Sequence, residues 1–185
     1  LAQAGISLSP AECDSVAGLA DWLHAGIAKL HTAQVNPASP EPAMAAGVDG
    51  LLDRDLFAQG QALRNGSVTA VALTQACLAR IAARNPAYRA FYTVTSVRAL
   101  ADAARADAEL ALGQDRGPLH GIPIGIKDMI DVAGVATTAN APGRAQAIAE
   151  RDAEVVARLA EAGAVVIGKT ATYEWGTVGP DNRGL

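Results

Sequence analysis

Residues 117–128 read Gly-Pro-Leu-His-Gly-Ile-Pro-Ile-Gly-Ile-Lys-Asp, and the architecture expected for the chain follows from them. Isoleucine at every second position predicts a β-strand over residues 122–127, with the isoleucines on one shared, buried face of a sheet. These residues are Ile122, Ile124 and Ile126. Gly117 and Pro118 break the chain before the strand, because neither residue favours a regular element.

Lys127 ends this predicted strand on the side opposite the isoleucines. It shares that side with Pro123 and Gly125, which leave room for another backbone or a ligand to approach. The carboxyl ends of strands in open α/β sheets are common ligand sites. Two interpretations stay open from these residues alone: Lys127 carries chemistry, or it extends into water at a strand end, which is the commoner case. In the second case Asp128 is a candidate surface partner of the lysine, although adjacent residues of a strand point to opposite faces.

A second clear pattern covers residues 152–168. Residues 152–163 carry apolar side chains at helical spacing, with Asp152 as the expected N-terminal cap and Gly163 as the expected stop. Residues 164–168 form a short apolar run that is typical of a buried parallel strand. Strand, crossover helix and strand make a βαβ unit, so the predicted fold class is α/β.

Helices dominate the chain before residue 117. The expected elements are a helix over 51–63 that ends at Asn65-Gly66, a helix capped by Thr69 and stopped by Asn85-Pro86, a strand over 90–95, and an alanine-rich helix capped by Ser96 and reaching about Gly113. Residues 9–32 predict an amphipathic helix, and the prolines of residues 33–50 predict a linker or an extended strap. We therefore divide the chain into a helical extension with a Pro-rich linker, 1–50, and a domain, 51–185.

Composition and charge limit the classes of function. Half of the 185 residues are hydrophobic and 18% are charged, which disfavours a disordered chain. The formal net charge of −4 comes from residues 1–50, because the rest of the chain holds 14 acids and 14 bases. We expect no direct nucleic-acid binding, since no basic stripe is present. Apolar runs stay below the roughly 20 residues that span a bilayer, so we expect no membrane segment. Two cysteines far apart in the sequence favour reduced thiols, and a cytoplasmic location is the default expectation.

Histidines and cysteines do not fall at metal-ligand spacing, so we expect no metal and no cofactor. Cys77 lies on an apolar helical face and is expected to be a reduced, buried thiol. His120 is expected to face solvent or pack within its loop rather than act as an acid or base, and Glu174 is expected to be structural. Cys13, His24 and His31 receive no chemical role.

The segment around Lys127 resembles the amidase-signature family. Members carry Gly-Pro-Leu-x-Gly-Ile-Pro-x-x-x-Lys-Asp followed by Asp-Val-x-Gly-x-x-Thr-Thr, which this chain matches over 117–128 and 131–138. The similarity runs in the expected order over residues 51–185, and includes 152–164, 165–170 and Glu174-Trp175. It implies the N-terminal part of an amidase-signature fold, with a mixed central sheet covered by helices.

In that family the lysine of the matched motif belongs to a Ser-Ser-Lys triad, and the matching position here is Lys127. The resemblance implies that the neutral lysine accepts a proton through a bridging serine, so that a second serine attacks an amide carbonyl. A lysine is a base near neutral pH only when its surroundings depress its pKa, whereas an arginine stays protonated. The implied substrate is a small-molecule amide.

Neither serine of the triad has a counterpart in this chain. Its last serine is Ser96, which precedes the lysine, so the 185-residue chain alone is expected to be inactive. A homodimer or a C-terminal portion of the domain is the expected partner. Asn140-Ala141 stands where many members have Gly-Ser, and Ala171 replaces a common asparagine. Both departures lie outside the triad.

Three functions remain open from the sequence. One is an amidase acting on carbon–nitrogen bonds. Another is a catalytically silent fragment that serves as an interaction or structural partner, and the third is the amide-transferring subunit of a tRNA amidotransferase complex. Residues 1–50 resemble in layout the small accessory subunit of tRNA-dependent amidotransferases, fused here in front of the amidase part. An ordinary N-terminal extension fits them equally well.

Overall fold

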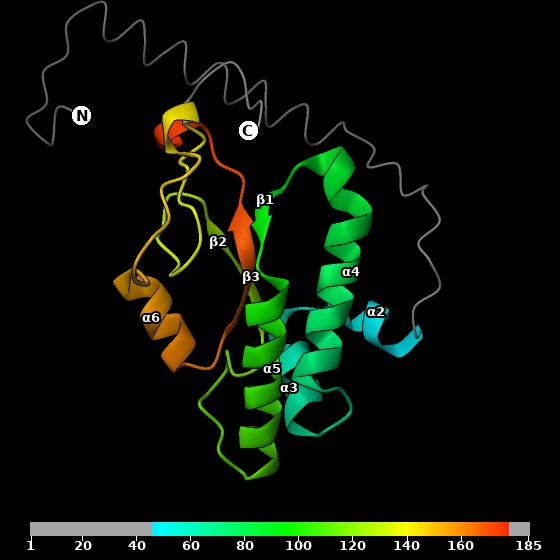
Figure 1. Cartoon of the computed structure of the whole chain (residues 1–185). Helices are drawn as coiled ribbons and strands as arrows, with labels where there is room; N and C mark the ends of the chain where they lie inside the picture. The colour runs from blue at the N-terminus through cyan, green and yellow to red at the C-terminus, as the bar shows by residue number, and fades with distance from the viewer. Residues whose placement is uncertain (1–45, 178–185) are drawn as a thin grey trace, which may run out of the picture. The chain divides into compact units, whose positions relative to one another are not determined.

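The computed structural model describes residues 46–177 (Figure 1). Contacts divide the chain into two compact units, 1–40 and 41–185, and the described residues all belong to the second. Its elements are α2 (Ala46–Leu52), α3 (Leu56–Arg64), α4 (Ala70–Tyr88), β1 (Phe91–Val94), α5 (Ser96–Ala111), β2 (Pro123–Lys127), η2 (Pro142–Arg144), α6 (Glu154–Glu161), β3 (Val165–Thr170) and η3 (Glu174–Gly176). The helix predicted over 9–32 lies outside the described residues.

The described strands form a three-stranded mixed sheet in the order β1-β3-β2. β3 lies in the middle, parallel to β2 and antiparallel to β1. α6 lies on the connection between β2 and β3. The predicted βαβ unit, the α/β class and the mixed sheet are therefore confirmed.

Alternate residues of β3 face two different layers of helix. Val165 and Ile167 pack in one cluster with residues of α4 and α5, among them Leu73. Val166 packs in a second cluster with Val156 of α6. α4 and α5 therefore cover one face of the sheet and α6 lies over the other (Figure 1). Burial of each such aliphatic side chain contributes roughly 1.5–3 kcal/mol, so both layers hold β3 in place.

The isoleucines of the segment 117–128 do not share one face. Ile122 packs in the cluster of α4 and α5, whereas Ile126 packs in the cluster of α6, and Ile124 contacts both. The prediction that the three isoleucines share one buried face is therefore wrong. The reason is local: Ile122 precedes the first paired residue of β2 and lies in a turn, where its N–H donates to the carbonyl of Leu119 at 3.1 Å.

The region before residue 65 departs from the prediction in two ways. α2 begins at Ala46, so the last residues of the predicted linker are helical, and Val48 among them packs on the core. The helix predicted over 51–63 is two helices, because Asp55 starts a new one: its Oδ1 accepts from the N–H of Ala58 at 2.8 Å. The boundary at residue 50, and the nature of residues 1–50, stay predictions.

Helix α4 confirms its predicted start and corrects its predicted end. The hydroxyl of Thr69 accepts from the N–H of Ala72 at 3.0 Å, as a cap does. The helix passes through Pro86 and ends only where Arg89 takes a left-handed conformation, φ 48°. Proline is tolerated here because it lies in the last turn and removes one hydrogen bond. The side chain of Asn85 then holds both backbone groups of Phe91, at 2.8 and 2.9 Å.

Two residues expected to cap helices do not do so. Ser96 is the first residue of α5, and the residue before it, Thr95, uses its hydroxyl to bond the carbonyl of Val166 in β3 at 2.9 Å. Asp152 does not cap α6, whose N-cap is Ala153. Both cap predictions are wrong: α5 begins one residue earlier than a cap at Ser96 predicts, and the carboxylate of Asp152 binds Arg98 and the N–H of Ala133 instead.

Gly163 ends α6 as predicted, and its conformation explains why glycine is there. Its φ is +82°, and a Cβ at this position would lie 2.3 Å from Cδ2 of His120. The His120 ring therefore packs on the bare backbone of the turn that enters β3. Gly134 has a similar φ, +74°, with nothing within 4 Å of the same position.

We expect Gly163→Ala to destabilise the fold more than Gly134→Ala does. Both substitutions carry the left-handed penalty of about 1 kcal/mol, and only the first forces an overlap with His120, which adds about 1–3 kcal/mol. Urea unfolding of both variants measures the difference. Equal losses would show that the close packing of His120 on residue 163 contributes nothing.

Candidate active site

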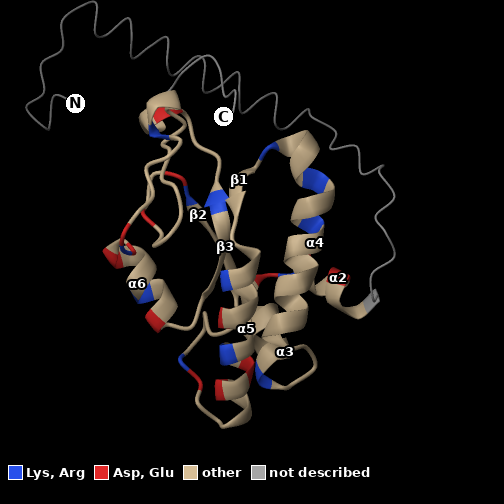
Figure 2. Cartoon of the chain, in the orientation of Figure 1, with Lys and Arg blue, Asp and Glu red and all other residues tan. Residues whose placement is uncertain are grey.

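Lys127 is the last residue of β2, as predicted, and its side chain is exposed among the described residues. Its carbonyl accepts from the N–H groups of Met129 and Ile130, at 2.7 and 3.0 Å, so the chain turns directly after the strand. β2 and β3 run parallel, and their carboxyl ends therefore meet at one edge of the sheet. Figure 2 shows basic positions at these neighbouring strand ends.

Neighbouring strands approach Gly125 closely, although the glycine itself is exposed. A Cβ at Gly125 would lie 2.7 Å from Cγ2 of Thr170 and 3.4 Å from the ring of Phe91. Part of the room predicted for another backbone or a ligand is therefore taken by the protein at this position. Glycine is needed because β3 and β1 pack closely there, and Lys127 projects beyond the filled part.

Asp128 is the reverse of the predicted surface residue. It is 1% exposed, and its Oδ1 lies 2.9 Å from Nζ of Lys169, which is 0% exposed. Lys169 Nζ also donates to Thr137 Oγ1 at 2.8 Å and to the carbonyl of Ala136 at 3.1 Å. The sequence patterns did not predict this pair. The available signal was a lysine that directly follows a run predicted to be a fully buried strand.

The segment after β2 closes around this pair. Thr138 donates its hydroxyl to the second carboxylate oxygen of Asp128 and also bonds it through its N–H, at 3.2 Å. The same hydroxyl accepts from the N–H of Asn140 at 3.0 Å. The N–H of Ala139 donates to the Asp128 carbonyl at 2.9 Å. The paired threonines of the motif thus bind the buried charges directly.

Left-handed backbone explains one departure from the family motif. Ala139 and Asn140 have φ of 49° and 55°. Asparagine adopts this conformation more readily than most residues, so it can stand where many members have glycine. The carbonyl of Ala139 accepts from the N–H of Trp175 at 2.9 Å, and the Arg144 guanidinium lies 5.3 Å from the Trp175 ring centre. These contacts tie the segment to η3.

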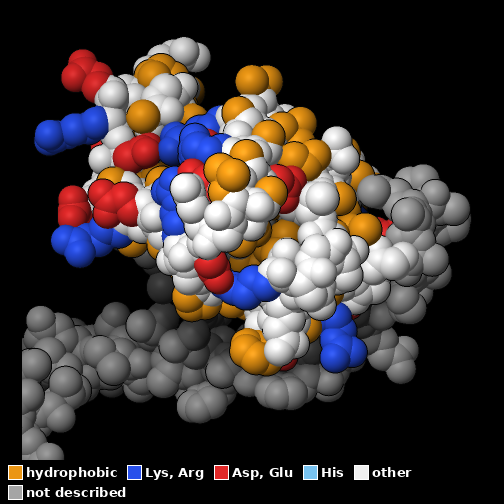
Figure 3. Space-filling view, turned by 90° about the horizontal axis from the view of Figure 1, so that it is seen from below, with side chains coloured by type: hydrophobic (Ala, Val, Ile, Leu, Met, Phe, Trp, Pro, Cys, Tyr) orange, Lys and Arg blue, Asp and Glu red, His pale blue; other side chains and the backbone are white. Residues whose placement is uncertain are grey.

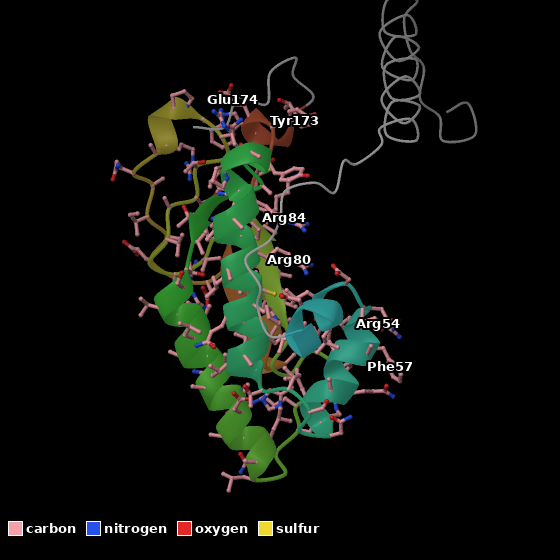
Figure 4. The ribbon with its side chains drawn as sticks, turned by 90° about the vertical axis from the view of Figure 1, so that its right-hand side faces the viewer. Arg54, Phe57, Arg80, Arg84, Tyr173 and Glu174 are labelled. Atoms are coloured by element: carbon pink, nitrogen blue, oxygen red, sulfur yellow. The ribbon has the colours of Figure 1, made fainter. Side chains whose placement is uncertain are left out.

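His120 lies away from Lys127, before the opposite end of β2. It is 1% exposed, so the loop-packing interpretation is confirmed and the solvent-facing one is wrong. Its Nδ1 accepts from the N–H of Arg116 at 3.1 Å, which places the ring proton on Nε2, 3.0 Å from Oε2 of Glu109. Glu174 begins η3 with an exposed side chain (Figure 4). Neither residue joins Lys127.

A groove of about 550 Å³ runs beside α4, and Lys127 does not line it among the described residues. Arg80 and Arg84 project from α4 toward this side (Figure 4). Cys77 also lines the groove; it is unpaired and half-buried, and burial raises the pKa of its thiol while Arg80 opposes the shift. On the face drawn in Figure 3, acidic, basic and hydrophobic side chains are interspersed.

Asp152 links the segment after β2 to α5. Its Oδ2 lies 2.9 Å from Nη2 of Arg98, and its Oδ1 accepts from the N–H of Ala133 at 2.7 Å. The Arg98 hydrogen bond, and secondarily the Ala133 N–H, hold the pKa of Asp152 below its ordinary value, against the effect of burial. A depressed carboxyl pKa stabilises the fold above the unfolded pKa of about 4, and that contribution is lost as pH falls through the folded value.

We therefore expect Arg98→Met to lower stability by about 1–2 kcal/mol at pH 7, and by less once the pH has fallen well below 4. Urea unfolding at several pH values measures this. Arg105→Met is the matched control, because Arg105 lies on the same helix, is exposed and, within residues 46–177, pairs only with Asp102. An equal, pH-independent loss in both variants would contradict the role given to Arg98 and Asp152.

Within residues 46–177, no three histidine, cysteine or acidic side chains gather as a metal site. None of the helices in that range is long and apolar enough to cross a membrane. The site is therefore an α/β strand end with one exposed lysine beside a closed, buried ion pair.

Comparison with known proteins places the chain in a family. The family model described as Amidase matches residues 72–181, and the chain is a member of the amidase family. A glutamyl-tRNA(Gln) amidotransferase subunit of Roseiflexus sp. (strain RS-1) is 50% identical over 109 residues, which are 59% of this chain and 22% of that protein. An amidase of Pseudomonas putida is 39% identical over 125 residues, 66% of this chain and 26% of that one.

Solved structures give the same assignment. The native peptide amidase from Stenotrophomonas maltophilia superposes with a TM-score of 0.65 and 40% identity, over 69% of this chain and 26% of that one. Fatty acid amide hydrolase has the same TM-score at 19% identity, and so shows the fold alone. The predicted family and fold are confirmed. The chain spans about a quarter of the length of these relatives.

Proposed function

We propose that this chain is the N-terminal part of an amidase that cleaves carbon–nitrogen bonds of small amides, with Lys127 as the lysine of a Ser-Ser-Lys triad. The observation that carries the proposal is the placement of Lys127. It projects from the carboxyl end of a parallel strand, inside the residues that the family model matches, beside a segment locked by buried hydrogen bonds.

The chemistry follows from the residue type. The neutral amine of Lys127 takes a proton from a bridging serine, which takes one from a second serine as that oxygen attacks the amide carbonyl. Collapse of the tetrahedral intermediate breaks the carbon–nitrogen bond and leaves an acyl-enzyme, and the amine leaves with a proton. Water then attacks the ester and releases the acid. Both serines come from the rest of the domain, because the last serine here is Ser96.

The proposal also accounts for the exposed side chain of Lys127. A lysine is neutral near pH 7 only when burial or nearby positive charge lowers its pKa. About three quarters of a relative's chain lies outside the part that is matched here, and that part of the protein can cover the strand end. We therefore expect the amine to become a base only in the completed domain.

A chimera tests the proposal. Residues 46–177 of this chain replace the aligned part of the Stenotrophomonas maltophilia peptide amidase, so that the serines come from the rest of that protein. Release of ammonia from a primary amide should be detectable. A chimera that folds, melts cooperatively and releases no ammonia would favour the silent structural partner instead.

A second candidate function has its own support. The 50% identity to a glutamyl-tRNA(Gln) amidotransferase subunit favours transfer of an amide group to glutamyl-tRNA(Gln). The two functions share the triad and differ in acceptor. Hydrolysis of small amides by the completed protein alone favours the amidase, whereas ammonia release that requires the other subunits of the Roseiflexus complex favours the amide-transferring role.

A further inference from the structure

The buried ion pair of Asp128 and Lys169 takes no part in the proposed Ser-Ser-Lys chemistry. Its two side chains are 1% and 0% exposed, and their charged atoms lie 2.9 Å apart. Withdrawing two charges from water costs free energy that pairing at best offsets, so such a pair is weak evidence for stability alone. Asp128 directly follows Lys127, which points to a role at the strand end.

Asp128 and Lys169 connect the end of β2 to several neighbouring segments through hydrogen bonds. The N–H of Asp128 donates to the carbonyl of Thr170 in β3 at 3.0 Å, and its own carbonyl accepts from Ala139 at 2.9 Å. Its carboxylate binds Thr138, and Lys169 binds Thr137. The backbone from which Lys127 projects is therefore held by β3 and by the segment 137–140 together.

The ion pair also keeps the buried end of β2 free of net charge. Together the two side chains carry no net charge, whereas either one alone would leave a buried ion next to Lys127. The Asp128 carboxylate also affects Tyr92 of β1. Burial raises the pKa of Tyr92, the hydrogen bond to the carbonyl of Thr172 lowers it, and the charge of Asp128 raises it further. An unpaired Asp128 carboxylate would likewise favour the charged form of Lys127, which accepts no proton.

We propose that Asp128 and Lys169 are positioning residues for Lys127: their pair fixes the end of β2 and keeps it free of net buried charge. The inference rests on the proposed function, in which Lys127 must be a base. It concerns groups that touch neither substrate nor the reacting atoms.

The full chain allows a direct test, because its lysines are only Lys29, Lys127 and Lys169. Lysine labelled with ¹³C at Cε gives one NMR signal for each, assigned with Lys29→Arg and Lys127→Arg. Lys169→Met leaves the Asp128 carboxylate buried without its partner, so the Lys127 Cε signal should move at pH 7, because the backbone from which this side chain projects is no longer fixed by the pair. Asp128→Asn combined with Lys169→Met removes both charges and should return the Lys127 signal to its original position.

An unchanged Lys127 signal in Lys169→Met, or the same displacement in the double variant, would overturn the proposal. If Lys169→Met does not fold, the double variant decides: its Lys127 signal should keep the original position, and a displaced signal would contradict the proposal. None of these measurements uses an amide. Failure of the proposed function appears separately, as amide hydrolysis that survives the loss of Lys127.

Discussion

Lys127→Ala should lower kcat for amide hydrolysis by about 10³–10⁴-fold in the chimera with the Stenotrophomonas maltophilia peptide amidase, because the general base is then missing. This corresponds to about 4–5.5 kcal/mol of activation free energy. KM should change little, since the lysine acts on the serines and not on the ground-state substrate. Initial rates of ammonia release over a range of substrate concentrations measure both constants.

A matched control separates catalysis from a general loss of charge. Arg151→Ala removes one exposed cation that has no interaction among the described residues. Its kcat should stay within about twofold of the unmodified chimera. Normal turnover in Lys127→Ala would refute the role of the lysine. Equal losses in both variants would attribute the effect to charge rather than to a base.

Lys169→Met should produce the largest loss of stability in the chain, about 3–5 kcal/mol, because it leaves the Asp128 carboxylate buried without its partner. Methionine keeps most of the volume of the lysine stem, so the loss reports the charge rather than a cavity. Urea unfolding at pH 7 measures the change in the free energy of unfolding.

The double substitution is the control for this result. Asp128→Asn with Lys169→Met removes both charges and should recover most of the loss, since replacing a buried ion pair by neutral groups is often close to neutral. A coupling free energy above about 1 kcal/mol is expected from the cycle. Additive losses would show that the two side chains do not depend on each other.

Periodic patterns in the sequence predicted the parts of the fold that depend on local spacing. The apolar run of residues 164–168 and the strand ending at Lys127 are the parallel neighbours β3 and β2, because a short run and a crossover helix allow few other arrangements. Thr69 caps α4 as its spacing indicated. These features are set by residues within one or two turns of each other.

Features that depend on distant partners were not predictable in the same way. Asp152 has the sequence of a cap, yet Arg98, 54 positions earlier, takes its carboxylate. Ile122 fits the alternation of β2 but belongs to the turn before it. At Asp152 a tertiary contact overrides a capping preference, which carries about 0.5–2 kcal/mol. At Ile122 the cause is a local turn that the alternating pattern did not indicate.

The same distinction between local spacing and distant partners applies to the residues of the candidate site. Lys127 could be named from its strand end and its motif, because both are continuous in sequence. Lys169 could not, since its burial results from the meeting of β3 with Asp128 and Thr137, which lie 41 and 32 positions away. A charged residue that directly follows a predicted buried strand is the signal that marks such a position.

The turnover of a Lys127→Arg chimera tests the central claim most directly, because arginine keeps the charge and length of the side chain but stays protonated. If residue 127 must be neutral to receive a proton, kcat/KM for a primary amide should fall as far as it does in Lys127→Ala. An arginine variant within about tenfold of the unmodified enzyme would contradict the claim, since a general base contributes at least about 10²-fold.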